Sequence, residues 1–306
     1  MQLADLFYTE VIPVGLWIVM FGMGLSLTPK DIRNVFATPK ALSVGLTGQL
    51  VLLPLLAFAI AVLLAPTPAI AVGAVILASC PGGVTSNAYS FASRADVALS
   101  VSLTAVTSFV TIFSVPLLTY FALLFFVDEG VRPELPVAEM VYTLAKLTVI
   151  PVAIGMIVRY LWSERTRRLI EGLRMATFLF LLALITAGTI VSFDVLKEHF
   201  AQTAVVAVSL NVLAMCMGFV LGRIFRLSVP QRISITYEVG VQNITLSAVV
   251  VLSLLGNEEF FVVTLVYAVI MKLTALTFMY FARRWLVSEE RAPSEAAPRV
   301  TVEGRS

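Results

Sequence analysis

The sequence predicts an all-α, polytopic membrane protein with nine transmembrane helices. Of its 306 residues, 59% are hydrophobic and only 13% are charged, whereas soluble domains carry roughly 25% charged residues. Several apolar runs reach the roughly 20 residues that a helix needs to cross a bilayer. The expected surroundings are therefore a lipid bilayer, and the net charge of +2 gives no reason to expect a nucleic-acid partner.

Nine apolar segments have the length of a membrane span. They cover about residues 9–27, 41–64, 69–93, 97–126, 138–161, 175–193, 201–222, 232–254 and 260–282. Residues 1–285 are thus expected to form the transmembrane domain. The polar segment 286–306 contains Pro, Ser and charged residues and is expected to be a disordered tail.

The placement of Lys and Arg predicts the orientation, because these residues accumulate in the loops that stay inside. With the N-terminus outside and the C-terminus inside, seventeen of the 21 Lys and Arg residues fall in inner segments. Only Arg132 and Lys197 fall outside, while Lys146 and Lys272 lie within spans. An odd number of spans agrees with this bias.

Counting the spans predicts an inverted repeat. Spans 1–4 begin outside and spans 6–9 begin inside, an arrangement that is typical of secondary transporters with broken helices. On this register span 3 corresponds to span 8. Span 3 contains Pro81, Gly82 and Gly83, and span 8 contains Gly240, so a helix break is expected in each.

Glu238 is the most costly residue of the predicted spans. A charged side chain at mid-membrane costs roughly 2.5–3.5 kcal/mol on insertion scales and needs a cavity or a partner. A single Gln, Ser or Thr in a span most often forms an interhelical hydrogen bond. Here, however, Glu238 does not stand alone. The oxygen-bearing set taken together comprises Gln49, Ser86, Asn87, Ser100, Thr104, Glu238, Gln242 and Asn243. Oxygen-rich sets suit hard cations, so an alkali-ion site is predicted rather than a soft-metal site.

Four segments in order, "FGMGLSL", "CPGGVTSN", "ADVALSVSLT" and "EVGVQN", resemble the bile acid:sodium symporter family over residues 11–282. The resemblance implies two discontinuous helices, spans 3 and 8, that cross at mid-membrane. It also implies a core domain (about 41–126 and 201–282) that moves against a panel domain (about 9–27 and 138–193). Two sodium ions would bind beside the crossing, and an organic anion between the domains.

The resemblance also implies the ligands of both ions. The first sodium site would use Ser86, Asn87, Ser100, Thr104 and Glu238. The second would use Gln49, Glu238, Gln242 and the backbone carbonyls of Val239 and Val241. Many bacterial members have ten spans, and position 241 is often Met in them, so this chain departs from the family's usual pattern in both respects.

Thr85, Asn243 and Lys272 are the candidate contacts of the substrate. Lys272 lies near the middle of span 9, too deep to reach either interface easily. It would pair with Glu238, hold the carboxylate of an anionic substrate, or bond to backbone carbonyls, and the sequence leaves these alternatives open.

The expected function is a sodium-coupled symporter that imports an organic anion by alternating access across a bacterial inner membrane. Bile acid-like, pantoate-like and keto-acid substrates all fit this expectation. Two sodium ions are the only cofactors expected, and no obligatory protein partner is. A proton-coupled or exporting carrier of the same fold is the alternative. An enzyme is not expected, because the spans contain no His-x-x-x-His pair and no paired aspartates. A sensor would need more than the short tail.

Overall fold

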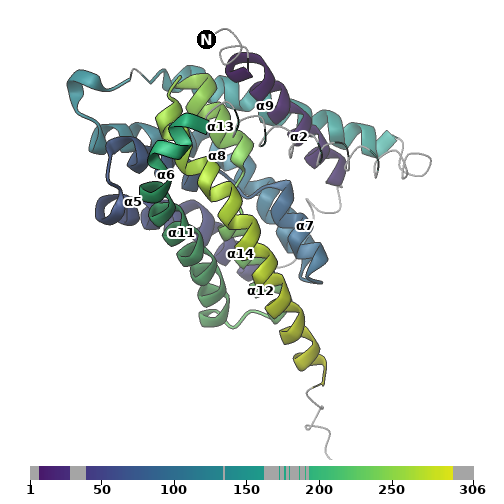
Figure 1. Ribbon diagram of the computed structural model, residues 1–306. Coiled ribbons are helices and arrows are strands. Elements are labelled where there is room, and N and C mark those ends of the chain that lie inside the picture. The colour runs from purple at the N-terminus through teal and green to yellow at the C-terminus, as the bar shows by residue number, and fades with distance from the viewer. Residues whose placement is uncertain are drawn as a thin grey trace, which may run out of the picture.

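The computed structural model describes residues 7–27, 39–133, 135–161 and 193–291, with isolated positions between 172 and 190. All regular elements in these parts are helical (Figure 1), which confirms the predicted all-α fold for them. Six helices there are long and apolar enough to cross a bilayer: Thr9–Ser26, Pro39–Leu64, Val97–Phe126, Val137–Leu161, Phe200–Ile224 and Glu258–Leu286. The predicted sixth span, 175–193, lies almost wholly outside the described residues.

The first helix packs closely against the fifth predicted span. A π-helical turn η1 (Phe7–Val11) leads into α2 (Ile12–Ser26), and α2 lies along α9 (Val137–Leu161). Glycines permit this approach. A Cβ atom at Gly155 would lie only 2.8 Å from the backbone nitrogen of Leu25, closer than real Cβ contacts. At the end of the pair, Arg159 donates to the carbonyl oxygen of Leu25 at 2.7 Å.

The second span contains a local distortion around Pro54. It runs through α4 (Pro39–Thr47), the π-helical turn η2 (Gly48–Leu52) and α5 (Leu53–Leu64). A proline ring inside a helix clashes with the carbonyl four residues earlier. The π-turn widens the helix there, and the Leu53 amide reaches back to the carbonyl of Gly48. Such turns recur at functional sites, and this one carries Gln49.

The third span is interrupted in its middle. Helix α6 (Pro68–Ser79) ends before Pro81, and α7 (Val84–Ala92) begins after Gly83. Cys80 is extended (φ −69°, ψ 154°), because the residue before a proline is disfavoured in helical geometry. A hairpin then leads to α8 (Val97–Phe126), where the Asp96 carboxylate accepts the Leu99 amide at 3.0 Å and caps the helix.

The C-terminal part also contains an interrupted helical segment. After the 3₁₀ turn η3 (Glu129–Val131) and α9, the described chain resumes with α11 (Phe193–Ile224). It continues through α12 (Val229–Gly240), α13 (Ile244–Ala248), the π-turn η4 (Val249–Leu254) and α14 (Glu258–Arg291). The predicted eighth span is therefore interrupted between Gly240 and Ile244. Helix α14 runs beyond residue 286, where the sequence predicts a disordered tail to begin.

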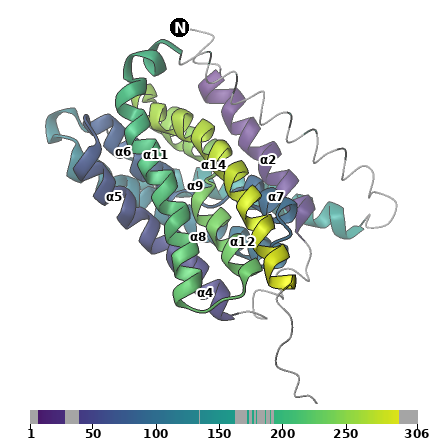
Figure 2. The ribbon, with the colours of Figure 1, turned by 60° about the horizontal axis from the view of Figure 1, so that its bottom comes forward.

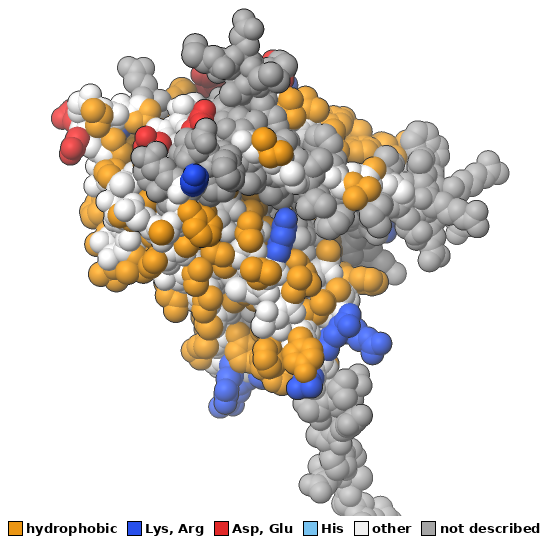
Figure 3. Space-filling view, in the orientation of Figure 1, with side chains coloured by type: hydrophobic (Ala, Val, Ile, Leu, Met, Phe, Trp, Pro, Cys, Tyr) orange, Lys and Arg blue, Asp and Glu red, His pale blue; other side chains and the backbone are white. Residues whose placement is uncertain are grey.

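Helices far apart in the sequence lie side by side. Helix α11 packs on α12 and α14, α14 on α6, and α6 on α8, and Figure 2 shows α11, α14 and α12 as one group with α2 at its flank. On the face drawn in Figure 3, hydrophobic side chains cover the middle. Most of the visible Lys and Arg side chains lie toward the end where α14 finishes, and Asp and Glu lie toward the opposite end.

Candidate functional site

The two helix interruptions lie against each other. Gly82 and Gln242 form an isolated antiparallel bridge, and the Asn243 amide donates to the carbonyl oxygen of Pro81 at 3.0 Å. Extended backbone from both breaks is thereby paired in the interior, where unpaired backbone groups are costly. Next to this contact between the two breaks, residues from α7, α8 and α12 form one buried polar site.

Glu238 lies at the centre of this buried polar site. Its side chain is 0% exposed, and its carboxylate accepts the Ser86 hydroxyl at 2.8 Å and the Thr104 hydroxyl at 2.9 and 3.0 Å. Within the described residues, these two hydroxyls are its only hydrogen-bond partners. A buried carboxylate without a cationic partner calls for a bound cation or a proton.

The remaining members of the first predicted set surround the same carboxylate. The Asn87 side-chain oxygen accepts the Ser100 hydroxyl at 2.8 Å and the Thr104 hydroxyl at 3.2 Å. Thr104 thus contacts both Asn87 and Glu238. The structure therefore brings together all five residues of this set, from α7, α8 and α12.

The second predicted set forms an adjoining cluster of amides. Gln49 donates to the carbonyl oxygen of Cys80 at 2.8 Å and to the side-chain oxygen of Gln242 at 3.0 Å. The amide group of Gln242 donates to the carbonyl oxygen of Val239 at 2.7 Å. The oxygen Oε1 of Gln49 is buried and has no hydrogen-bond partner. This unpartnered buried oxygen is an unused acceptor, which a cation would satisfy.

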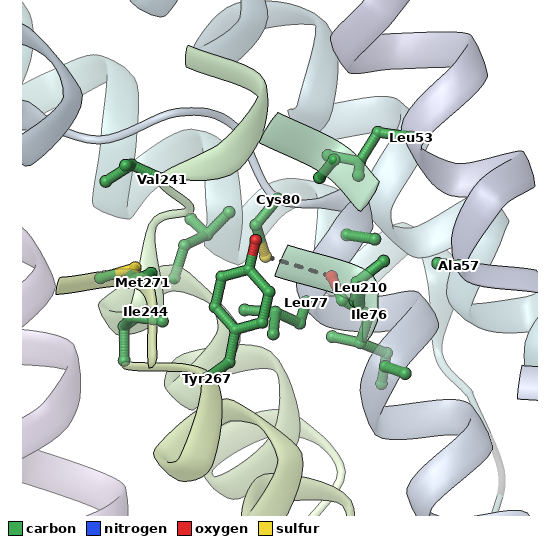
Figure 4. Packing of buried hydrophobic residues seen from close by; sticks show 14 of the residues in the cluster. Leu53, Ala57, Ile76, Leu77, Cys80, Leu210, Val241, Ile244, Tyr267 and Met271 are labelled. Carbon is green, nitrogen blue, oxygen red and sulfur yellow. Dashed lines mark hydrogen bonds between the residues drawn. The ribbon is translucent and has the colours of Figure 1, made fainter. Parts of the chain in front are cut away.

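One side of the two helix breaks is closed by apolar packing. Cys80, Leu77, Leu210 and Tyr267 belong to a continuous buried cluster (Figure 4). The Cys80 thiol lies within this cluster and donates a hydrogen bond to the carbonyl oxygen of Ile76 at 3.3 Å. The Cys80 side chain therefore packs in the apolar cluster beside the break, while its backbone carbonyl accepts the hydrogen bond from Gln49.

The candidate substrate contacts are less closely joined. The side-chain oxygen of Asn243 caps α13 by accepting the Leu246 amide at 3.0 Å, and its amide nitrogen is buried without a partner. Gly83 approaches it, since a Cβ there would lie 3.7 Å from the Asn243 Cα. Thr85 is half-buried at the start of α7. Lys272 is half-buried on α14, and its ammonium group makes no hydrogen bond or ion pair with any described residue.

Three residues at the break, Asn211, Tyr267 and Thr274, are not predicted from the sequence. The carbonyl oxygen of Gly240 accepts the Asn211 amide at 2.9 Å and the Tyr267 hydroxyl at 2.9 Å. Thr274 in turn donates to the side-chain oxygen of Asn211 at 2.6 Å. The only signal in the sequence is that Asn211 is a single amide in an apolar run, which by itself is typical of an interhelical bond.

The chemistry of this site is that of oxygen ligands. Among the described residues, no group of three or more His, Cys, Asp or Glu side chains is arranged to hold a metal ion. Hydroxyl groups contact the Glu238 carboxylate, and these hydroxyls also contact the Asn87 amide oxygen and the Gly83 carbonyl oxygen. Such donors suit a hard cation and not a soft transition metal.

Helices long enough to span a bilayer, with a buried carboxylate at two facing helix breaks, define a multi-pass membrane protein. Residues 13–199 match the profile of the Sodium Bile acid symporter family. This match covers more than half of the chain, so the chain belongs to the sodium bile acid symporter family, a family of sodium-dependent transporters. The resemblance seen in the sequence motifs is thereby confirmed.

Curated relatives extend the match through most of the chain. An uncharacterized sodium-dependent transporter of Bacillus subtilis is 28% identical over 246 residues, covering 78% of this chain and 73% of the relative. A probable sodium/metabolite cotransporter of rice chloroplasts is 30% identical, covering 77% of this chain and 55% of the relative. The human ileal sodium/bile acid cotransporter is 27% identical, covering 89% of this chain and 78% of the relative. All three are named as transporters or cotransporters.

Proposed function

We propose that this protein is a sodium-coupled symporter that imports a small organic anion across the inner membrane of a bacterium. The observation that carries the proposal is the buried Glu238 carboxylate, which only hydroxyl groups contact among the described residues. A sodium ion beside it would supply the missing positive charge. The names of the relatives, which refer to sodium with metabolites or bile acid, support the same class of transport.

Two ion sites would share this carboxylate. The first would be formed by the set already joined by hydrogen bonds: Ser86, Asn87, Ser100, Thr104 and Glu238. The second would be formed by Gln49, Glu238, Gln242 and the carbonyls of Val239 and Val241. The free oxygen of Gln49 supports this second site. The carbonyl of Val239 now accepts the Gln242 amide, so loading the ion would require the Gln242 amide to turn.

The anion would bind next to the ions, at Asn243 and Thr85, with Lys272 as an additional positive charge. The unpartnered amide nitrogen of Asn243 supports this position, because a carboxylate would complete its hydrogen bonding. Sodium and substrate sites that adjoin at broken helices are a recurring design of transporters. Binding of each would then favour the same backbone geometry at the crossing.

Transport would proceed by movement of the core, about 41–126 and 201–282, against the panel, about 9–27 and 138–193. The close pairing of α2 with α9 supports a panel that moves as a unit. The nine spans, with the N-terminus outside, remain part of this proposal. The surface in Figure 3 supports that orientation, since basic side chains gather toward one end and acidic ones toward the other.

The test needs no knowledge of the substrate. Thermal unfolding of the purified protein in detergent is measured in sodium chloride, with potassium chloride at equal ionic strength as the reference. A ligand that binds only the folded state at 100 times its Kd stabilises by about 2.7 kcal/mol. We therefore expect a rise in Tm that is specific for sodium in the wild type and is lost in Glu238→Gln.

Glu129→Gln is the matched control, because Glu129 is an exposed carboxylate in the turn before α9. It should keep the full response to sodium. No sodium-specific shift in the wild type would refute sodium coupling. A shift in Tm with pH that requires Glu238 would then favour the proton-coupled carrier.

A further inference from the structure

Helix α7 ends with an arginine in the left-handed backbone conformation. Arg94 has φ 56°. Its amide donates to the carbonyl oxygen of Phe91 at 3.1 Å, and the Ala95 amide donates to that of Ser90 at 2.9 Å. These two hydrogen bonds form a Schellman motif. Its left-handed position is usually occupied by glycine, because a Cβ atom is disfavoured there.

Helix α11 ends in the same way. Arg226 has φ 53°, its amide donates to the carbonyl oxygen of Arg223 at 3.0 Å, and the Leu227 amide donates to that of Gly222 at 2.9 Å. These two arginines are the only non-glycine residues with positive φ that the structure describes. In the turn between η4 and α14, by contrast, the left-handed position is taken by Gly256, with φ 62°. Arginine is thus used twice where glycine would relieve the backbone, which indicates a use for its side chain.

The two arginines lie on hairpins that are joined to each other. The Asp96 amide donates to the carbonyl oxygen of Pro230 at 3.3 Å, and the Ser234 hydroxyl donates to that of Asp96 at 2.7 Å. Arg94 precedes Asp96 by two residues, and Arg226 precedes Pro230 by four. Both arginines therefore lie beside this joint between the α7–α8 and α11–α12 hairpins.

The surface around this joint is basic. Arg94, Arg223 and Arg226 are exposed, and their side chains form no ion pair or hydrogen bond with a described residue. Arg283 on α14 donates through Nε and Nη2 to the carbonyl oxygen of Ala92 at 3.0 and 2.6 Å, which adds a fourth positive charge beside the end of α7. Guanidinium groups bind phosphate through paired hydrogen bonds, so a phosphate group would suit this surface.

Large apolar side chains adjoin these charges. Phe91 is 75% exposed, Ile224 66% and Phe225 45%, and each lies within three residues of Arg94 or Arg226. Exposed apolar side chains of a multi-pass membrane protein face lipid chains, and a neighbouring arginine can extend from there to the headgroups. A molecule that carries a phosphate next to apolar chains is a phospholipid.

We propose that this surface binds the headgroup of an anionic phospholipid, and that Arg94 and Arg226 contact its phosphate. The Schellman motifs fix the backbone from which both side chains extend, so little ordering of the chain is needed on binding. This inference goes beyond the proposed function, because it depends neither on sodium nor on a transported anion.

The probes are phosphatidylglycerol, which is anionic, and phosphatidylcholine with the same acyl chains, which carries no net charge. Thermal unfolding is measured in mixed micelles at constant ionic strength in potassium chloride, while the mole fraction of each lipid is raised. The wild type should show a rise in Tm that is specific for phosphatidylglycerol. A basic residue near an anionic lipid surface contributes about fivefold in affinity. Arg94→Gly combined with Arg226→Gly should therefore raise the mole fraction for half-maximal stabilisation by at least about tenfold.

In phosphatidylcholine, the glycine double variant should unfold at the same temperature as the wild type or higher, because glycine relieves the left-handed backbone. Arg94→Lys combined with Arg226→Lys keeps both charges and should keep at least half of the rise in Tm. The matched control is Lys40→Gln combined with Arg284→Gln, which removes two exposed positive charges from α4 and α14. This control should respond to phosphatidylglycerol as the wild type does.

An unchanged response to phosphatidylglycerol in the glycine double variant, or an equal loss in the control, would overturn the inference. A lower Tm of the glycine double variant in phosphatidylcholine would also overturn it, because the arginines would then serve the fold. Equal stabilisation by inorganic phosphate at the same concentration would overturn the assignment to lipid. The rise in Tm with sodium is measured separately in the same proteins, so the outcome for the proposed function stays distinct.

Discussion

Gly82 makes room for the carboxylate of Glu238. A Cβ atom at this position would collide with the Glu238 side chain, whereas a Cβ at Gly83 would meet nothing closer than 3.7 Å. Crowding of this kind in a packed interior typically costs about 1–3 kcal/mol. The two neighbouring glycines therefore allow a matched comparison of the same substitution.

We expect Gly82→Ala to displace the carboxylate and to raise the sodium concentration for half-maximal stabilisation by at least about tenfold, which corresponds to 1.4 kcal/mol. Gly83→Ala should leave it nearly unchanged. The measurement is the sodium titration of Tm for both variants. Equal sodium dependence of Tm in the two variants would mean that the Glu238 carboxylate, as placed beside Gly82, does not take part in sodium binding.

Lys272 carries a charge that has no partner among the described residues. If it holds the anion, Lys272→Met should abolish stabilisation by organic anions such as ketoisocaproate and leave stabilisation by sodium unchanged. Lys146→Met is the control, because Lys146 is exposed on α9 and lies apart from the crossing. Unchanged anion binding in Lys272→Met would refute the role. Loss of the sodium response would point instead to a link with Glu238.

At the scale of elements, the break after α12 is stabilised by its neighbours. No proline follows Gly240. The backbone becomes extended at Val241, and this change leaves the Gly240 carbonyl without a helical partner. Asn211 from α11 and Tyr267 from α14 both donate to this carbonyl. These two hydrogen bonds satisfy the carbonyl that the break exposes and tie the broken segment to α11 and α14.

Asn211→Leu should therefore lower the stability by about 1–3 kcal/mol, because it leaves buried polar groups of Gly240 and Thr274 with fewer partners. It should also raise the sodium concentration for half-maximal stabilisation several-fold, by loosening the carbonyls beside Gly240. Thr203→Val on the same helix is the control, since the Thr203 hydroxyl is buried without a partner. Similar losses in both variants would show that α11 only supports packing.

The sequence predicts one break more clearly than the other, and the structure explains why. Pro81, Gly82 and Gly83 predict a break from the local sequence alone. The break at Gly240 depends on Asn211 and Tyr267, which come from helices distant in the sequence and therefore leave no local pattern. The side chains around Glu238 could be predicted because mid-membrane polar residues are rare. Asn211 could not, because a single amide in an apolar run usually forms an ordinary interhelical hydrogen bond.

At the scale of the whole molecule, α2 and α9 pair with each other and meet the helices around Glu238 mainly through α8. Helix α2 contacts α9 most extensively, while α11, α12, α14, α6 and α8 form a connected group. A cavity of about 250 Å³, lined mainly by residues of α2, α8 and α9, lies between these two groups. Movement of α2 and α9 against the other helices would therefore change the shape of this cavity, in agreement with the proposed movement of core against panel.

The proposed stoichiometry makes transport sensitive to voltage. Two sodium ions with one monovalent anion carry one net positive charge inward, and 100 mV acts on that charge with about 2.3 kcal/mol. Accumulation of the anion should therefore rise roughly tenfold for each 60 mV of inside-negative potential. The measurement uses proteoliposomes with a fixed sodium gradient and potassium diffusion potentials set by valinomycin, with Glu238→Gln as the inactive control. Accumulation that does not change with potential would require a single sodium ion per anion, and the shared carboxylate would then serve one site instead of two.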